Sequence, residues 1–325
     1  MNKKVILERI LSFIITLILS TIILFVLIRL APGDPVKIFL GTPETSDVSK
    51  TNYQERYDAL VKELNLDKPI PNQYIAWMKK AVKFDFGNSI YSKQPVVDEL
   101  KSKLPATLLL TIPAIILQLI VGLSLGIISA INHNKLSDNL IRLFCAFIAS
   151  IPGFALSLIL IYLFAVKLGS YEISPSTSLT RLWLPALTLG VISSPGIIRV
   201  VRTSILEELG KPYVGFLISM GAKKIRIIKN VLLNIILPVI AISSTTFANL
   251  IGGSVVIENV FSWPGIGKYA MDSILKRDYP IIQGYGFLMV CFVILINVLV
   301  DVIYMSFDPT IKSMRLKTNE NKNEI

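Results

Sequence analysis

Few residues of this chain have the chemistry of a catalytic or metal-binding site. The single histidine, His133, lies in a polar stretch and cannot hold a metal ion alone. The two cysteines, Cys145 and Cys291, lie inside apolar runs, where a free thiol usually acts as a small hydrophobic side chain. No nucleophile motif and no zinc-protease motif is present. We therefore predict no catalytic residue, no metal site and no cofactor.

The sequence also disfavours nucleotide and nucleic-acid binding. The string closest to a phosphate-binding loop is GIGKY at residues 265–269, which lacks the first glycine of the motif and ends in tyrosine. The net charge is +11, but no RNA- or DNA-binding motif accompanies it. Because cytoplasmic loops of membrane proteins collect lysine and arginine, we attribute the positive charge to such loops.

One basic segment, KPYVGFLISMGAKKIRIIKN at residues 211–230, is also rich in apolar side chains. Pro212 suits a first helical turn and Gly221 permits the backbone reversal that ends a helix, so we predict a short helix over residues 213–220. The apolar positions at helical spacing are Val214, Leu217 and Ile218, together with Phe216 and Met220. Such a helix can lie on the membrane, pack on its own bundle or dock into another protein.

The chain around this segment has the composition of a membrane protein. Of its 325 residues, 53% are hydrophobic and 17% are charged, and the mean hydropathy is +0.63. An average soluble domain carries about 25% charged residues. Six windows contain no Asp, Glu, Lys or Arg and have about the length that a membrane span needs. They are residues 10–28, 104–131, 143–166, 182–198, 230–257 and 279–300. We predict an all-α membrane protein with six transmembrane helices.

Two of these windows allow more than one interpretation. The first follows Lys3, Lys4 and Arg9 as a signal peptide does, but its apolar stretch is too long for one, so we expect an uncleaved anchor. The fourth is short and contains Pro185 and Pro195, which fits either a kinked helix that lines a cavity or a merely short span.

Lysine and arginine in short loops predict the orientation. They gather in the N-terminal tail, in residues 199–229 and in the C-terminal tail, which six spans place on one side. We expect that side to be the cytoplasm. The opposite side then holds residues 31–103, which include two stretches with helical apolar spacing and form a small helical extracellular segment. Asp301, beside an apolar run that continues past it, is a candidate to pair with a neighbouring helix.

Strings along the whole chain resemble one transporter family. PYVGFLISMGAKK, followed by NVLLNIILP with Asn234 and Pro238, is similar to the EAA-type loop of ABC importer membrane subunits. Further matching strings are RLAPGDPV (29–36), LNLDKPIPNQYIAWM (64–78), DFGNSI (85–90), LPATLLL (104–110), LPALTLG (184–190), RVVRTSILEEL (199–209), GGSVVIENVFSWPGIG (252–267), RDYPIIQG (277–284) and NVLVDVIYMSFDP (297–309). By this resemblance the chain looks like a B-type membrane subunit of the dipeptide/oligopeptide/nickel permease family.

The resemblance implies a type I ABC importer transmembrane fold in three parts. Residues 1–103 would form an N-terminal transmembrane anchor with the extracellular helical segment. Residues 104–305 would form the transmembrane core with a cytoplasmic coupling loop at 199–230, and residues 306–325 a cytoplasmic tail. The residues that would contact an ATPase are Tyr213, Val214, Phe216, Leu217, Ile218, Met220, Gly221 and Ala222.

The resemblance also implies partners in the plasma membrane of a bacterium. A second homologous permease subunit would complete the path, two cytoplasmic ABC ATPases would hydrolyse ATP, and an extracellular solute-binding protein would deliver solute. Di- or oligopeptides are the expected cargo, and nickel or a metal–chelator complex is the alternative; no substrate-binding residue is assigned. The competing classes are an intramembrane enzyme and a stand-alone carrier, and co-purification with an ATPase separates an importer from a stand-alone carrier.

Overall fold

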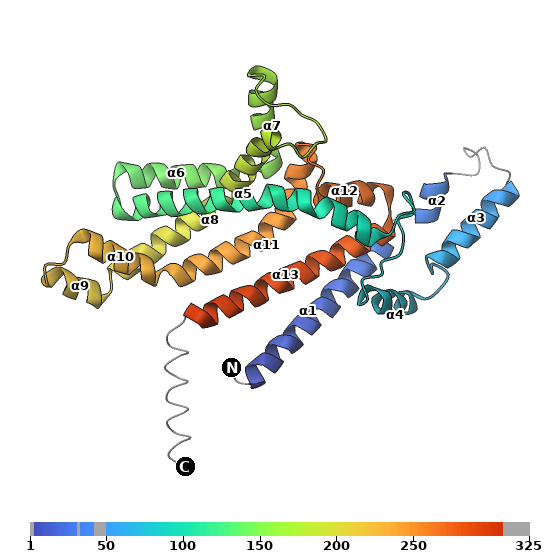
Figure 1. The fold of residues 1–325 in the computed structure, drawn as a ribbon, viewed down its shortest axis with the longest axis horizontal. Helices are drawn as coiled ribbons and strands as arrows, with labels where there is room; N and C mark the ends of the chain where they lie inside the picture. The colour runs from blue at the N-terminus through green and yellow to red at the C-terminus, as the bar shows by residue number, and fades with distance from the viewer. Residues whose placement is uncertain (1–2, 31–32, 42–49, 308–325) are drawn as a thin grey trace, which may run out of the picture. The chain divides into compact units, whose positions relative to one another are not determined.

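The computed structural model describes residues 3–30, 33–41 and 50–307. Within these ranges the β-type pairing is confined to an isolated bridge between Asn88 and Pro95. The helices are α1 (Lys3–Leu30), α2 (Pro35–Leu40), α3 (Lys50–Glu63), α4 (Ile70–Ala81), α5 (Val96–Ile131), α6 (Leu136–Ser150), α7 (Gly153–Ile161), the π-helix η1 (Tyr162–Lys167), α8 (Leu179–Leu209), α9 (Pro212–Ser219), α10 (Lys224–Asn234), α11 (Ile236–Val260), α12 (Ile266–Lys276) and α13 (Tyr279–Phe307). Figure 1 follows them along the chain, and the all-α prediction is confirmed.

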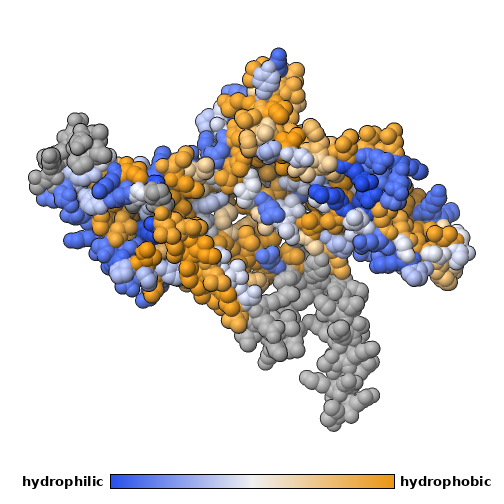
Figure 2. Space-filling model, turned by 180° about the vertical axis from the view of Figure 1, so that it is seen from behind, coloured by the Kyte–Doolittle hydropathy of each residue, from blue (hydrophilic) through white to orange (hydrophobic). Residues whose placement is uncertain are grey.

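Five of the described helices are long and apolar enough to cross a membrane, and α6 with α7 and η1 make a sixth span if that bent pair is counted as one. The six predicted windows fall on these elements. A charged residue at the centre of a span costs about 2.5–3.5 kcal/mol on insertion, so stretches without charge mark the spans. Hydrophobic residues cover much of the surface in Figure 2, as a lipid-facing surface requires. The side chain of Asp301 lies outside the described part of the chain.

Four stretches differ in detail from the prediction. The third window bends by 98° between α6 and α7, where Pro152 has no N–H to continue the helical ladder. The fourth is not short, because α8 runs for 31 residues with Pro185 and Pro195 inside it. The fifth begins in α10 and breaks at Ile235. Residues 258–278 lie between the fifth and sixth windows, for which no helix is predicted; they contain α12, and Glu258 belongs to the last turn of α11.

Tertiary contacts divide the chain into two units, and each is described by itself. The first comprises Met1–Thr107 and Ser262–Ile294, and the second comprises the rest. The boundary predicted after residue 103, and the separate tail, stay predictions.

In the first unit, Asp34 joins two of the short helices. One of its carboxylate oxygens accepts hydrogen bonds from the backbone nitrogens of Val36 (2.9 Å) and Lys37 (3.3 Å) and so caps α2. The other accepts a 2.6 Å hydrogen bond from the hydroxyl of Tyr57 on α3, which raises the pKa of Tyr57 to about 12. The acidic residue of the APGDP string therefore fixes the entry to the small helical segment.

Aromatic contacts fix α4 against α1 in the same unit. The ring of Phe25 lies 5.5 Å from that of Tyr74 and 5.7 Å from that of Trp77, measured between centroids. The hydroxyls of Tyr74 and Thr21 are 3.0 Å apart. Both helices predicted between the first two spans are present as α3 and α4, and α4 rests on a membrane helix.

In the second unit, α8 is enclosed by other helices, with 61% of its most apolar window buried. Glycines on α5 allow the close approach of that helix to α8. A Cβ added at Gly122 would lie 2.5 Å from Cγ2 of Ile197, and one added at Gly126 would lie 2.7 Å from Cβ of Val201. These separations leave no room for a side chain larger than hydrogen.

We expect Gly122→Ala to destabilise the protein by about 1–3 kcal/mol, because the methyl group would overpack the contact between α5 and α8. Gly196→Ala is the matched control: Gly196 lies in α8, the other helix of this contact, and a Cβ there meets nothing within 4 Å. Urea unfolding of both variants in detergent micelles measures the difference. Equal stability of the two variants would contradict this packing.

Candidate functional site

The short basic helix predicted from the sequence is present as α9, in the turn between α8 and α10 at one end of the second unit (Figure 1). Pro212 occupies its first turn, and Lys211 precedes it in an extended conformation. Gly221 ends it with φ +74°, and the backbone nitrogen of Ala222 donates to the carbonyl of Leu217 across the reversal (3.0 Å). The helix begins and ends one residue earlier than predicted, and the predicted positions of Pro212 in the first turn and Gly221 in the reversal are confirmed.

One face of α9 packs on its own chain. Val214 is 2% exposed and belongs to a buried cluster with residues of α5, α8 and α10, among them Ile205 and Val231. Three more of the eight predicted contact residues pack against this cluster, namely Tyr213, Leu217 and Ala222. The structure therefore places half of the predicted set on this packed face, which we call the α9 base. Val214 is too deeply buried there to contact a partner protein.

The other face of α9 is apolar and exposed. Phe216, Ile218 and Met220 are 64%, 61% and 69% exposed, and Gly221 beside them is exposed as well. We call Phe216, Ile218 and Met220 the α9 tip. Exposed clusters of large apolar side chains mark sites of protein or membrane contact.

A buried carboxylate fixes the base of α9. Glu208, at the end of α8, is 5% exposed and accepts hydrogen bonds from the Tyr213 hydroxyl (3.0 Å) and from Nδ2 of Asn234 (2.5 Å). Its second oxygen forms an ion pair with Lys211, which raises the pKa of Lys211. Burial, and then the bond to Glu208, raise the pKa of Tyr213. The carboxylate of Glu208 thus joins α8, α9 and α10.

The sequence did not identify Glu208. Its neighbour Glu207 is identical in type and is exposed, so composition alone does not say which of the two is buried. Spacing does not separate them either, because Lys211 lies four residues after Glu207 and three after Glu208, and both spacings suit an ion pair. Asn234 was singled out only as part of a family string, and the structure gives it a contact.

A second buried ion pair holds the turn between α5 and α6 against α8. Asp138, 0% exposed, accepts two 2.8 Å hydrogen bonds from the guanidinium of Arg202 and a 2.5 Å bond from Ser129. His133 lies 3.0 Å from the same guanidinium. The single histidine is therefore part of a structural network, and α8 is fixed about two turns before its own end at Leu209.

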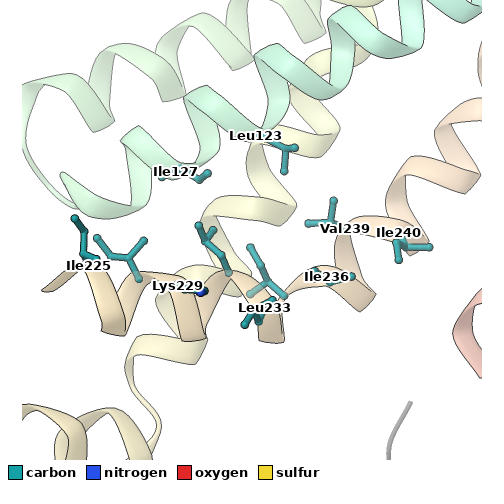
Figure 3. A pocket seen from close by; sticks show the side chains of 11 residues that line it. Leu123, Ile127, Ile225, Lys229, Leu233, Ile236, Val239 and Ile240 are labelled. Carbon is teal, nitrogen blue, oxygen red and sulfur yellow. The ribbon is translucent and has the colours of Figure 1, made fainter. Parts of the chain in front are cut away.

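An apolar groove of about 590 Å³ runs beside this site, between α5, α10 and α11. Figure 3 shows Leu123 and Ile127 on α5 on one side of it, and Ile225, Lys229 and Leu233 along α10 on the other. The other lining side chains are also aliphatic. Binding pockets for polar solutes place a few polar groups among apolar ones to fix orientation. This groove therefore does not have the lining of a peptide-binding pocket.

Two family descriptions cover most of the chain. Residues 122–313 match the family described as "Binding-protein-dependent transport system inner membrane component", and residues 2–111 match the N-terminal part described for the same membrane components. Among curated relatives, the "Glutathione transport system permease protein GsiC" of Escherichia coli K12 is 34% identical over 308 residues, which are 94% of this chain and 98% of that protein. The protein of the same name from Shigella boydii is 33% identical over the same length.

A solved structure of low sequence identity has the same fold. The methionine ABC transporter MetNI, in an inward-facing conformation, matches with a TM-score of 0.54 at 19% identity, over 64% of this chain and 96% of that one. The fold, the apolar spans and the matches along the chain agree with one another. The chain belongs to the family of binding-protein-dependent transport system inner membrane components, and it is a permease subunit of an ABC importer, not an enzyme.

Proposed function

We propose that this subunit couples ATP hydrolysis by separate cytoplasmic ATPases to the import of di- or oligopeptides, and that the α9 tip is the point of coupling. The observation that carries the proposal is the division of α9 into a fixed base and an exposed apolar tip. Val214 is buried, whereas Phe216, Ile218 and Met220 are more than half exposed.

A rigid base favours docking into another protein over lying on the membrane. Glu208 receives bonds from a side chain of α9 and one of α10, so α9 and the end of α8 move as one body. A helix that only floats on lipid needs no such attachment, because lipid yields to any orientation. A helix that transmits a displacement to a span must be attached rigidly to that span, and α9 has such an attachment.

The assembly that follows contains four further subunits in a bacterial plasma membrane. A second homologous permease completes the translocation path, two ABC ATPases each receive one coupling helix, and an extracellular solute-binding protein delivers the solute. Both ends of the chain and α9 lie in the cytoplasm. The family description, which names a binding-protein-dependent system of the inner membrane, supports the solute-binding protein and the location.

ATP drives transport in this arrangement by binding one conformation better than the other. ATP closes the two ATPases, and the closure draws the two coupling helices together. Because the contacts of Glu208 join α9 to α8, the movement reaches a span that is 61% buried in its apolar window. The path then opens outward and accepts solute from the binding protein.

The cargo class rests on the similarity to curated relatives. The name of the 34% identical protein assigns it to glutathione transport, and glutathione is a small peptide. Import of nickel or a metal–chelator complex by the same machinery is the competing outcome. Proteoliposomes that contain the complete transporter and its binding protein should accumulate labelled dipeptide. They should do so only when ATP is supplied on the side of the membrane where the ATPases lie. ATP-dependent uptake of a nickel chelate without peptide uptake would reverse the assignment.

We expect Phe216→Asp to weaken association with the ATPase by at least about tenfold, because it places a charge in an apolar socket. A pull-down of the tagged permease with its ATPase measures the association. Ile225→Asp is the matched control, since Ile225 is 81% exposed on the next helix, beyond Gly221. If both variants retained the ATPase equally well, the tip would not be the docking surface.

We expect Glu208→Ala to lower the amount of solute transported per ATP hydrolysed by on the order of tenfold. Tyr213 and Asn234 would keep their mutual hydrogen bond (3.2 Å) but lose their bonds to α8, and this loss would loosen α9 against α8 by about 1–3 kcal/mol. Glu207→Ala removes the exposed neighbouring carboxylate and should leave this ratio unchanged. Parallel assays of ATP hydrolysis and uptake give the ratio. A fall of both activities in proportion would indicate lost protein and not lost coupling.

A further inference from the structure

A second candidate site lies in the first unit and has no part in the coupling described above. It is a cavity of about 340 Å³ at the end of α1. Its walls are the last turns of α1, the turn after α3, one side of α4, the loop after α4 and the first turn of α13. Its volume is at the lower end of the range of small-molecule sites, about 300–1,000 Å³.

Several buried polar atoms on the walls of this cavity have no hydrogen-bond partner among the described residues. They are Nε and Nη1 of Arg29, Nε1 of Trp77, Nε2 of Gln283 and Oε1 of Gln73. Gln73 is 6% and Gln283 is 5% exposed. Buried polar side-chain atoms are normally hydrogen-bonded, so a group of exceptions around one cavity needs a common explanation.

These side chains are held in place by contacts that do not use the unpartnered atoms. Nε2 of Gln73 donates to the carbonyl of Lys68 (2.7 Å), which leaves the carboxamide oxygen bare. The guanidinium of Arg29 lies 5.1 Å from the ring centroids of Phe25 and of Tyr279. The cavity is therefore organised before any ligand enters it.

The loop that closes one wall is fixed as well. The hydroxyl of Ser89 donates to Asp278 (2.6 Å), and the backbone nitrogen of Ile90 donates to the other oxygen of the same carboxylate (3.2 Å). Asp278 is 2% exposed and directly precedes α13. The loop at residues 85–88 and the start of α13 thus keep their spacing across the cavity.

The unpartnered atoms define the class of ligand. Four donor nitrogens and one carbonyl oxygen suit a ligand with strong acceptors and one donor, and a guanidinium favours a carboxylate. The charged residues of the lining are Arg29, Lys80, Glu63 and Asp85, two of each sign. A balanced lining fits a zwitterion better than a dianion such as phosphate.

We propose that this cavity binds the free carboxyl end of a small peptide, with the carboxylate at Arg29, Trp77 and Gln283 and the adjacent amide N–H at Gln73. The proposal concerns a single chain and goes beyond the coupling function. It holds whether or not the peptide bound here is the transported solute.

Equilibrium dialysis of radiolabelled glycylglycine against the full-length chain in lipid nanodiscs tests the proposal, with glycylglycinamide as the uncharged counterpart. No solute-binding protein is present, so its own site does not contribute. We expect saturable binding of glycylglycine, and binding of the amide weaker by at least about tenfold, since the amide lacks the negative charge. Absence of saturable binding, or equal binding of both compounds, would overturn the proposal.

Two variants test whether the ligand binds in this cavity. Arg29→Met and Gln283→Leu keep the size of each side chain and remove its donors, and each should weaken glycylglycine binding by about tenfold. Gln94→Leu, an exposed glutamine of the same unit, is the matched control and should bind normally. Thermal unfolding shows whether each variant is folded. If Arg29→Met does not fold, the binding measured with Gln283→Leu tests the proposal. Normal binding by Gln283→Leu would place the ligand elsewhere. If the complete transporter imports peptide but this chain binds none, the proposed cavity site is wrong and the proposed import function stands.

Discussion

The carboxylate of Glu208 is the contact on which the position of α9, and with it the proposed coupling, depends. It lies at the end of α8 and is bonded by Tyr213 of α9 and Asn234 of α10. A buried carboxylate must be satisfied, and these donors satisfy it only while the three helices keep their relative positions. Because Glu208 needs these hydrogen bonds, α9, which carries the exposed tip, is held in a fixed position relative to α8 and α10.

This constraint matters because the rest of the second unit is built to hold α8. Glycines on α5 allow that helix to approach α8 at Ile197 and Val201, and the Asp138–Arg202 ion pair attaches the α5–α6 turn to it. In a membrane, close packing and internal polar contacts replace the hydrophobic effect as the force between helices. Under the proposed coupling, a displacement of α9 therefore acts on a rigid span.

The sequence predicted the parts of this fold that follow from short-range or compositional rules. The spans follow from the cost of burying charge, and the ends of α9 follow from Pro212 and Gly221, which restrict the backbone by themselves. The bend at Pro152, the burial of Val214 and the role of Glu208 depend on which residues lie opposite in space. Helical spacing grouped Val214 with Leu217 and Ile218, but only the packing of α5, α8 and α10 decides which side is covered. The polar atoms around Arg29 come from segments more than 250 residues apart, so no local pattern unites them.

Photo-crosslinking from the α9 tip tests the central claim most directly. A photoreactive amino acid in place of Ile218, which is 61% exposed, reports what covers the tip in the complete transporter. The account predicts a crosslink to the cytoplasmic ATPase subunit. Crosslinks to lipid or to the extracellular binding protein, with none to the ATPase, would contradict it.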